Sequence, residues 1–509
     1  MLRPYVPKVL SAEDRKVFDT LVRRDHWVRQ ADRDVDFLKI REQLEKYYSL
    51  DVGSPGVEPV ILLKLELLMY HDNLSDSQVM RRAETDLAYR WFLGLGLNDH
   101  LPDVSTLRYF RKRLGVEGHQ AIFHSLLSQA RQKNLVKDRL RIKDASHLYA
   151  NIAVPAGLTL IAQARDRLLK TAEPFDPQSV ARERAQIESI RTSTDDHNNE
   201  ERRQSRVRHL RDILAWTEVL PAPPDTDENP AWKKLSQAIE IARKVLTGHD
   251  EPKEGDQLRS VSDPDARRGK HGEYYDGYLV DVTIDADSRL FTAVNVLQNV
   301  GEEASDAVVL VQQEMSHHAN QIEQLSIDGA GYHGPTLRQL EDDFSIEAFV
   351  PPKADSRPKQ FTPEEFSLSE DHSYVTCPAG QKSHYSQRDD ARHVTLYRFT
   401  KQTCTGCPLS DKCLSHKETA LGRSVRKNHY APEYDRLRER AETLEYAAIK
   451  KEHPNVERTL GQLMNRYGCR RARYRGQLRV LCQQIMGATT ANLNRLLKLM
   501  DTQIRMVFG

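Results

Sequence analysis

Apolar positions at two different spacings divide the chain into helical and strand-forming regions. From Val60 to Leu68 they recur at helical spacing, and Ser75 or Asp76 is suited to cap a second helix. A third helix follows, for which we expect Ser105 to be the N-cap. These patterns predict a compact, all-α N-terminal region over residues 1–138.

Strand-like alternation begins directly after this region. Leu140, Ile142 and Asp144 fall on one face of a strand, so a carboxylate occupies a position where an apolar residue is expected. Alternation resumes from Tyr278 to Ile284, and residues 285–288 (DADS) turn the chain into a returning strand. This pair of strands predicts a β-hairpin.

Helices and single strands follow the hairpin in turn. A helix near residues 304–319 leads to a short apolar strand that finishes at Asp328, and a helix from about Pro335 to Glu341 leads to a strand within residues 346–352. This order predicts a mixed α/β sheet with crossover helices. Glycines follow Asp328 at once, so a turn residue without any chemistry is the alternative interpretation of this acid.

Two long segments interrupt the sheet-forming pattern. Residues 157–270 are dense in charged helical sequence and predict a helical insertion, whose charges more often face solvent than a ligand. Residues 353–440 predict a second insertion. The predicted sheet therefore consists of residues 139–156 and 271–352, and residues 441–509 return the chain to it.

The second insertion carries four of the six cysteines of the chain. They are Cys377, Cys404, Cys407 and Cys413. A Cys-x-x-Cys pair with two further cysteines nearby offers four thiolates, the usual ligand set of a closed structural zinc site. Disulfides and unrelated free thiols are the alternatives, and His372 or His416 is available to replace one cysteine.

A helix near the end of the chain carries a third acid of interest. The helix is expected to begin at Pro454, and Val456 and Leu460 belong to one apolar stripe along it. Glu457 lies beside that stripe, so we expect it near the boundary of the core. Glu452 is the competing acid, and a first-turn Glu that only complements the helix dipole is the alternative interpretation of Glu457.

Basic surface has to be local, because the formal net charge of the chain is only +1. Two groups of arginines stand out, one on the third helix and one shortly after Glu457. The first group is Arg108, Arg111 and Arg113, and the second is Arg466, Arg470, Arg471, Arg473 and Arg475. Arginine matches the geometry of phosphate, so both groups predict contact with a DNA backbone. Solvated basic faces and surface salt bridges are the alternatives.

Several stretches together resemble a known family. PVILLKLELLMYHDNLSD, AYRWFLGLG and PDVSTLRYFRKRL resemble the InsH-type N-terminal domain of insertion-sequence transposases. SDPDARRGK, YYDGYLVDVTID and NVERTLGQLMNRYGCRRARYRG resemble parts of the RNase H-like catalytic domain of DDE transposases. The resemblance covers nearly the whole chain, and the ordered set of stretches is more specific than any one of them.

The resemblance implies a fold, a site and a reaction. The fold is an RNase H-like domain interrupted by the helical and the cysteine-bearing insertions, and its catalytic acids fall on Asp144, Asp328 and Glu457. They imply two Mg²⁺ or Mn²⁺ ions, cleavage and strand transfer of double-stranded DNA, and a homodimer or larger assembly on paired element ends. Tyr332 stands one residue further from Asp328 than is usual in the family.

Two other functions stay open from the sequence. One is a catalytically inactive, zinc-containing DNA-binding protein derived from a transposase, and the other is a structure-specific nuclease without strand transfer. No apolar run is long enough to cross a bilayer and the N-terminus has no hydrophobic signal core, so we expect an intracellular, cytoplasmic protein associated with the nucleoid.

Overall fold

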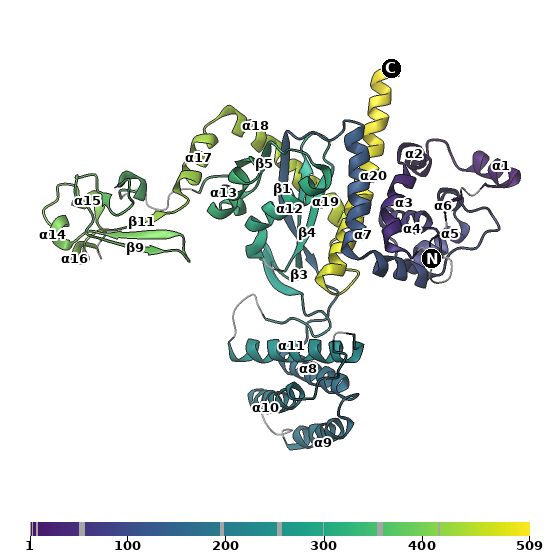
Figure 1. Ribbon diagram of the computed structural model, residues 1–509, viewed down its shortest axis with the longest axis horizontal. Coiled ribbons are helices and arrows are strands. Elements are labelled where there is room, and N and C mark those ends of the chain that lie inside the picture. Colours follow the sequence, from purple (N-terminus) through teal and green to yellow (C-terminus); the bar gives the residue numbers. More distant parts are fainter. Residues whose placement is uncertain are drawn as a thin grey trace.

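The computed structural model describes residues 2, 4–6, 9–49, 56–193, 198–226, 228–251, 257–298, 300–353, 360–415 and 418–508. Figure 1 shows how these residues are arranged around a central sheet. N-terminal helices lie on one side of the sheet, a β-rich part that carries the cysteines lies on the other, and a helical lobe lies below.

The N-terminal region is helical throughout its described elements, as the sequence predicts. Its helices are α1 (Ala12–Leu21), α2 (Trp27–Asp34), α3 (Phe37–Leu44), α4 (Pro59–His71), α5 (Asp76–Thr85), α6 (Leu87–Leu93) and α7 (Val104–Gln132). Ser75 caps α5 in a capping box with Gln78, as one of the two predicted caps. Ser105 does not cap α7, because the Asp103 carboxylate accepts the hydrogen bond from the Ser105 backbone N–H at 2.6 Å.

In the described part of the chain the main sheet has six strands. They are β1 (Leu140–Tyr149), β2 (Arg267–His271), β3 (Glu273–Asp285), β4 (Phe291–Leu297), β5 (Gln324–Ser326) and β6 (Glu347–Phe349). The order is β2-β3-β1-β5-β6, and β4 also pairs with β3. β1 runs antiparallel to β3 and parallel to β5, which is parallel to β6. The predicted hairpin is β3 and β4, whereas β2 lies partly inside the range predicted to be a helical insertion.

Gly277 of β3 lies between β1 and β2 and is paired with a residue of each. Tyr149 of β1 is its partner on one side and Arg267 of β2 is its partner on the other. A Cβ at residue 277 would lie 1.9 Å from the Leu148 carbonyl oxygen, so only glycine permits this close approach of the strands. The end of β1 and the start of β2 are therefore two strand spacings apart, roughly 10 Å.

Helices cover both faces of the sheet. α12 (Glu303–His318) and α13 (Gly334–Asp342) contribute to one apolar cluster with β5, β6 and α17 (Ala431–Ala441). α18 (Leu444–Glu452), α19 (Pro454–Arg466) and α20 (Gln477–Phe508) contribute to another. α17 contacts α13 and β6, so the chain returns to the sheet about ten residues earlier than the predicted boundary at 441.

The N-terminal helices and the sheet share one hydrophobic core. Buried residues from α2 to α7 belong to the same cluster as Ile142 of β1, Val282 of β3, Leu460 of α19 and Leu493 of α20. α7 and α20 lie side by side along this boundary (Figure 1). Residue 138 therefore separates two kinds of secondary structure but not two cores.

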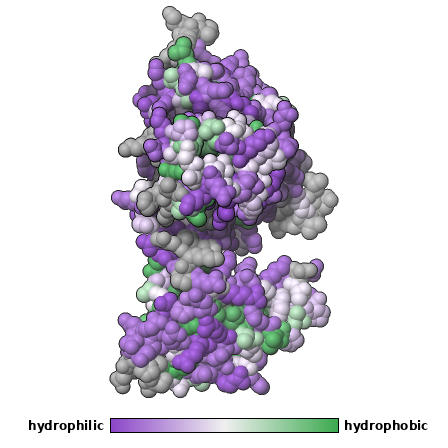
Figure 2. All heavy atoms as spheres, turned by 90° about the vertical axis from the view of Figure 1, so that its left-hand side faces the viewer, coloured by the Kyte–Doolittle hydropathy of each residue, from purple (hydrophilic) through white to green (hydrophobic). Residues whose placement is uncertain are grey.

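The helical lobe has a core of its own. It consists of α8 (Gly157–Ala172), α9 (Pro177–Ser193), α10 (Asn199–Glu218) and α11 (Pro230–Asp250). Its buried residues form a cluster separate from that of the sheet. Figure 2 shows the lobe as a distinct body below the rest, with apolar side chains gathered on part of its surface.

The cysteine-bearing part is built from short elements. They are β7 (Ser367–Leu368), β8 (Val375–Thr376), β9 (Tyr385–Asp389), β10 (Val394–Arg398), α14 (Lys401–Cys404), α15 (Ser410–Cys413), α16 (Glu418–Leu421) and β11 (Ser424–Asn428). β9 and β11 pair with the two edges of β10. Among the described residues, no helix is both long and apolar enough to cross a membrane.

Candidate active site

Two parallel strands place the first two acids next to each other. Leu140 is the register partner of Gln324, and Ile142 is the partner of Ser326. Two residues further along the same register, Asp144 of β1 lies level with Asp328, which directly follows Ile327 at the end of β5. Because neighbouring strands are roughly 4.8 Å apart, the backbone alone brings both carboxylates to one edge of the sheet.

The third acid reaches this edge from α19. The apolar stripe predicted for this helix is buried, with Val456 and Leu460 in the same core as Ile142 of β1. His453 immediately precedes the helix, and its Nδ1 lies 2.9 Å from the Ser326 hydroxyl at the end of β5. Glu457, in the first turn, is exposed and not at the core boundary as expected.

The charges of Asp328 and Glu457 both act on Asp144. Burial raises its pKa to about 6, and the negative charges of Asp328 and Glu457 act in the same direction. The Ala145 backbone N–H donates to Asp144 Oδ1 at 2.8 Å and, with Lys143, opposes the rise. The structure therefore brings together the three acids that the sequence singled out.

Asp328 also has the local geometry of a turn residue. Its carboxylate accepts a hydrogen bond from the Ala330 backbone N–H at 3.0 Å and caps the short 3₁₀ turn Gly329–Gly331. A Cβ at residue 331 would lie 2.6 Å from the Ile327 side chain, whereas one at residue 329 would meet nothing within 4 Å. Asp328 therefore caps a turn and also lies near the two other acids. Its interpretation as a turn residue and its interpretation as a catalytic acid are thus compatible.

Glu452 has a different position. It ends α18 and pairs with Arg139, which precedes β1, at 2.9 Å. Arg139 and Asp144 are five strand residues apart, roughly 16 Å. Glu452 therefore lies toward the opposite end of β1 from the three acids.

A buried charged cluster that the sequence did not indicate lies behind these acids. Lys143, next to Asp144 but on the other face of β1, forms an ion pair with Asp281 of β3 at 2.7 Å, and both side chains are almost fully buried. Burial raises the pKa of Asp281, while Lys143 opposes the rise. Burial also raises the pKa of Glu303 at the start of α12, and the charge of Asp328 adds to this. Strand alternation alone predicts that Lys143 faces solvent, so no local sequence pattern indicated its burial.

Tyr332 contacts α17. Its ring stacks on that of Tyr434 in α17, with the ring centroids 4.3 Å apart. The additional residue between Asp328 and this tyrosine is taken up by the turn Gly329–Gly331, so the tyrosine helps to attach α17 to the sheet.

The four cysteine side chains line one small apolar cavity of about 30 Å³ together with Phe366 and Phe399. All four are free thiols, so no disulfide joins them. Burial raises the pKa of the Cys413 thiol to about 11, and the other three cysteines act in the same direction. The Gln381 backbone N–H donates to Cys377 Sγ at 3.3 Å. His372 does not line the cavity, and His416 lies outside the described residues.

Neither the three carboxylates nor the four thiols are arranged as a complete metal site. Within the described ranges, no group of three or more His, Cys, Asp or Glu side chains is arranged so that it could hold a metal ion. The donors nevertheless have the right chemistry, with clustered carboxylate oxygens suited to Mg²⁺ or Mn²⁺ and clustered thiols suited to Zn²⁺.

The predicted DNA-binding arginines differ in their surroundings. Arg111 is half-buried and pairs with Glu66 at 2.5 Å and Asp76 at 2.7 Å, while it donates to the Tyr474 hydroxyl at 2.6 Å. Its role in the protein is to attach α7 to the chain beyond α19, which the sequence did not indicate.

Arg470 and Arg473 are also half-buried and bonded within the protein. Arg470 donates to the Ser146 hydroxyl at 2.9 Å, and Arg473 donates to Asn73 Oδ1 at 2.8 Å. The remaining arginines of the two groups have exposed side chains. They are Arg108, Arg113, Arg466, Arg471 and Arg475.

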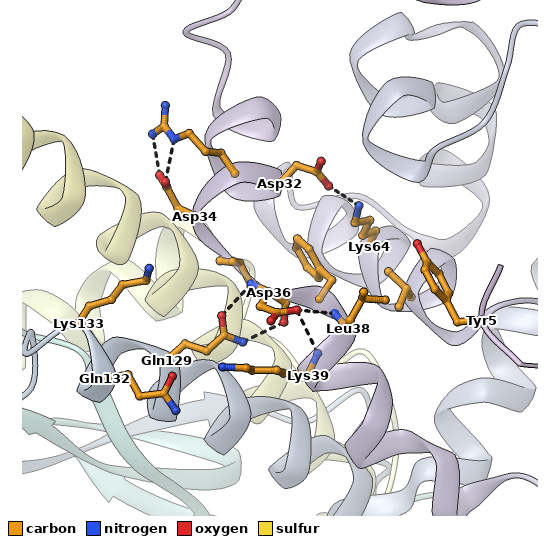
Figure 3. A pocket seen from close by; sticks show the side chains of 14 residues that line it. Tyr5, Asp32, Asp34, Asp36, Leu38, Lys39, Lys64, Gln129, Gln132 and Lys133 are labelled. Atoms are coloured by element: carbon orange, nitrogen blue, oxygen red, sulfur yellow. Dashed lines mark hydrogen bonds and ion pairs between the residues drawn. The ribbon is translucent and has the colours of Figure 1, made fainter. Parts of the chain in front are cut away.

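A much larger cavity lies away from the acids, among the N-terminal helices (Figure 3). It has a volume of about 660 Å³ and is lined by residues of α2, α3, α4 and α7. Lys64 pairs with Asp32 at 2.7 Å, Arg33 pairs with Asp34 at 2.7 Å, and Asp36 caps α3. Several of its charged groups are thus engaged within the protein, and the cavity contains none of the acids or thiols considered above.

Two family models match the chain. A model described as a transposase domain (DUF772) matches residues 16–113, and a model described as a transposase DDE domain matches residues 376–497. The second match includes the four cysteines and Glu457, whereas Asp144 and Asp328 lie in the part of the chain that neither model matches. No curated protein and no solved structure matched. The two matched domains, in this order, support a DDE-type insertion-sequence transposase.

Proposed function

We propose that this transposase binds double-stranded DNA at the ends of its element and catalyses DNA cleavage and strand transfer. The observation that carries the proposal is the parallel pairing of β1 and β5, which brings Asp144 level with Asp328 just beyond β5, while Glu457 in the first turn of α19 is near enough for its charge to act on Asp144. Sheet ligands are expected in the crevice beyond the carboxyl ends of such strands. The strand order and directions are those we expect of an RNase H-like domain.

The three acids would hold the catalytic ions. Asp144 and Asp328 offer oxygens from rigid backbone, and Glu457 offers a third from a helix whose apolar side is fixed in the core. Bound Mg²⁺ or Mn²⁺ would activate the attacking oxygen and stabilise the leaving oxygen of an in-line displacement. Carboxylates are suitable ligands because both ions prefer hard oxygen donors.

The rest of the site supports an intact centre more than an inactive derivative. Lys143 and Asp281 neutralise each other behind β1, so the strand that holds Asp144 is fixed by a buried pair. Ser326 and His453 join the end of β5 to the start of α19. These contacts join the elements that carry the three acids, as expected for the support of an active site.

DNA contact is proposed for the exposed arginines only. Arg108 and Arg113 belong to α7, and Arg466, Arg471 and Arg475 follow the Glu457 turn of α19. Their guanidinium groups are able to form paired hydrogen bonds with backbone phosphates. Paired element ends require at least two active centres, so we expect a homodimer or a larger assembly on DNA.

Cys377, Cys404, Cys407 and Cys413 are proposed to bind one structural Zn²⁺. The support is their convergence on one cavity as free thiols. We regard residues 353–430 and the lobe within 157–270 as insertions into the catalytic domain, because the sheet is continuous without them and α17 already packs on it.

The first experiment compares the wild type with Asp328→Ala in the cleavage of a DNA duplex that carries the flanking ends of the element. We expect Mg²⁺-dependent or Mn²⁺-dependent nicking by the wild type and a loss of more than about 100-fold in the variant, since loss of an outer-shell partner alone costs 10–100-fold. Asp343→Ala is the matched control, because Asp343 is exposed at the end of α13. Equal cleavage by both variants would return Asp328 to the role of a turn residue.

A further inference from the structure

Three arginines line a small cavity beside α19, the helix that carries Glu457. The cavity has a volume of about 110 Å³ and lies where the turn between β3 and β4 meets α19 and α20. We call it the arginine pocket, after Arg289 of the turn, Arg458 of α19 and Arg495 of α20. Thr459, Gln462 and Asn492 also line it, and no acidic residue does.

The positive charges of the pocket are not compensated within the described part of the chain. None of the three guanidinium groups has an ion-pair partner there. Arg495 donates from Nε to the Ser288 carbonyl oxygen at 2.7 Å, and it is half-buried. Burial lowers the pKa of Arg495, and the charge of Arg289 lowers it further. An anion in the pocket would relieve this repulsion.

The backbone holds Arg289 toward the pocket in an unusual conformation. Its φ is +60°, which is uncommon for a residue with a Cβ. The Arg289 backbone N–H donates to the Asp285 carbonyl oxygen at 2.8 Å and stabilises the turn. Asn492 bonds to both backbone groups of Phe291, at 2.8 and 2.9 Å, so the turn and α20 are fixed to each other.

The pocket lies on the neighbouring flank of the helix that carries Glu457. Successive residues on a helix are about 100° apart, so Arg458 faces the β3–β4 turn when Glu457 faces the two aspartates. Asp285, at the end of β3, is the register partner of Arg141. Arg141 is three strand residues from Asp144, roughly 10 Å along β1, so the turn and the three acids lie at different points along the same strand.

We propose that the arginine pocket binds one phosphate group of the DNA backbone, beside the strand segment that reaches the three acids. The proposal rests on the function proposed above. Guanidinium groups suit phosphate because they bind its oxygens in pairs. A volume of about 110 Å³ accommodates one phosphate group but not a nucleoside, since pockets for larger ligands measure roughly 300 Å³ or more.

The test measures the salt dependence of DNA binding by the full chain. The double variant Arg289→Asn/Arg458→Gln removes two charges from exposed side chains, and Asn tolerates a positive φ. We expect the slope of log K against log [salt] to decrease by about 0.9 in magnitude, the value for one lost phosphate contact. Lys16→Gln, on exposed α1, is the control variant and should leave the slope unchanged.

A neutral methylphosphonate, moved along the cleaved strand of the duplex, locates the contact. We expect one position at which it weakens binding by the wild type but not by the double variant. If the wild type and the double variant bind DNA with the same slope, the proposal is wrong, although DNA binding itself stands.

If the wild type binds no DNA, the proposed function is wrong, and the pocket is tested separately. Inorganic phosphate then serves as the probe, with thermal unfolding as the readout. A rise in Tm for the wild type that is absent in the double variant would assign the pocket to free phosphate and would overturn its assignment to DNA.

Discussion

Asp144 occupies a position that is unfavourable for an ionised carboxylate. Its strand position beside Ile142 favours an apolar side chain, and its neighbours Asp328 and Glu457 are themselves acids. Burial destabilises its ionised form and the like charges nearby add to this, which is why its pKa rises to about 6. Packing of β1, β5 and α19 has to offset this cost. An arrangement that is unfavourable for stability and well fixed in geometry is typical of functional sites.

Glu457 and Glu452 can be distinguished by a pair of equivalent substitutions. We expect Glu457→Gln to lower the metal-dependent cleavage rate at least about 100-fold while leaving thermal stability unchanged, because the side chain is exposed. Glu452→Gln loses only the partly exposed pair with Arg139, which is worth about 0–1 kcal/mol, and should keep cleavage. The reverse pattern of cleavage rates would make Glu452 the third acid.

The residues of the site were not equally easy to predict from the sequence. Asp144 stood out because it breaks an alternating pattern, and Asp328 because it ends an apolar run. Arg141 is entirely buried although alternation assigns it to solvent, since Glu314 of α12 pairs with it at 2.7 Å from a position 173 residues away. No local pattern reveals a charge that is neutralised so far along the chain.

At the scale of elements, long periodic segments were predicted well and short polar ones were not. The hairpin β3–β4 and helices α12, α13 and α19 follow from their apolar spacing. β2 is a five-residue strand of mainly basic sequence, and its place is set by pairing with β3. α17 buries only Glu433 and Leu437, so its sequence has almost no apolar stripe. Tertiary contacts, not propensity, determine these two elements.

The cysteine-bearing part should depend on metal for its own stability. Its core is small, with Phe366, Tyr397 and Phe399 among its few buried side chains, and its strands are short. We expect the purified wild type to contain about one zinc per chain and Cys404→Ser/Cys407→Ser to contain none. Elemental analysis of both proteins measures this.

Limited proteolysis provides the structural readout for the same variants. Chelation or loss of the two cysteines should expose residues 360–428 to cleavage, while the sheet stays resistant. Cys469→Ser is the control, because Cys469 is buried in the main core, away from the cavity. Zinc-free wild type that resists the protease equally would contradict a structural zinc site.

The whole molecule is organised around a core that crosses the boundary between its two matched domains. Tyr70 of α4 lies under Arg473, whose guanidinium is 5.0 Å from the ring centroid, and Arg111 of α7 reaches Tyr474. α20 packs along both α7 and α4. The N-terminal helices thus share a core with the matched DDE domain and pack against its last helix.

A fragment of residues 1–138 is therefore expected not to unfold cooperatively. It would expose apolar residues that α20 now covers, and each Leu or Val exposed costs about 1.5–3 kcal/mol against a total stability of about 5–15 kcal/mol. The comparison is a chain in which a short Gly/Ser linker replaces residues 157–261, since that lobe has its own core. Circular dichroism during heating should show a cooperative transition only for the second protein. A sharp transition for the fragment would show that the shared core is dispensable.

The position of Gly277 between Tyr149 and Arg267 has a consequence for how such chains diverge. The chain leaves the sheet from β1 and returns to it at β2, with only β3 between them, so the length of the segment between Tyr149 and Arg267 does not affect the pairing of β1 and β2 with β3. Gains, losses and exchanges of whole segments at this place leave the register of Asp144 and Asp328 untouched. Among related sequences we therefore expect length to vary most between Tyr149 and Arg267, and Gly277 to be kept.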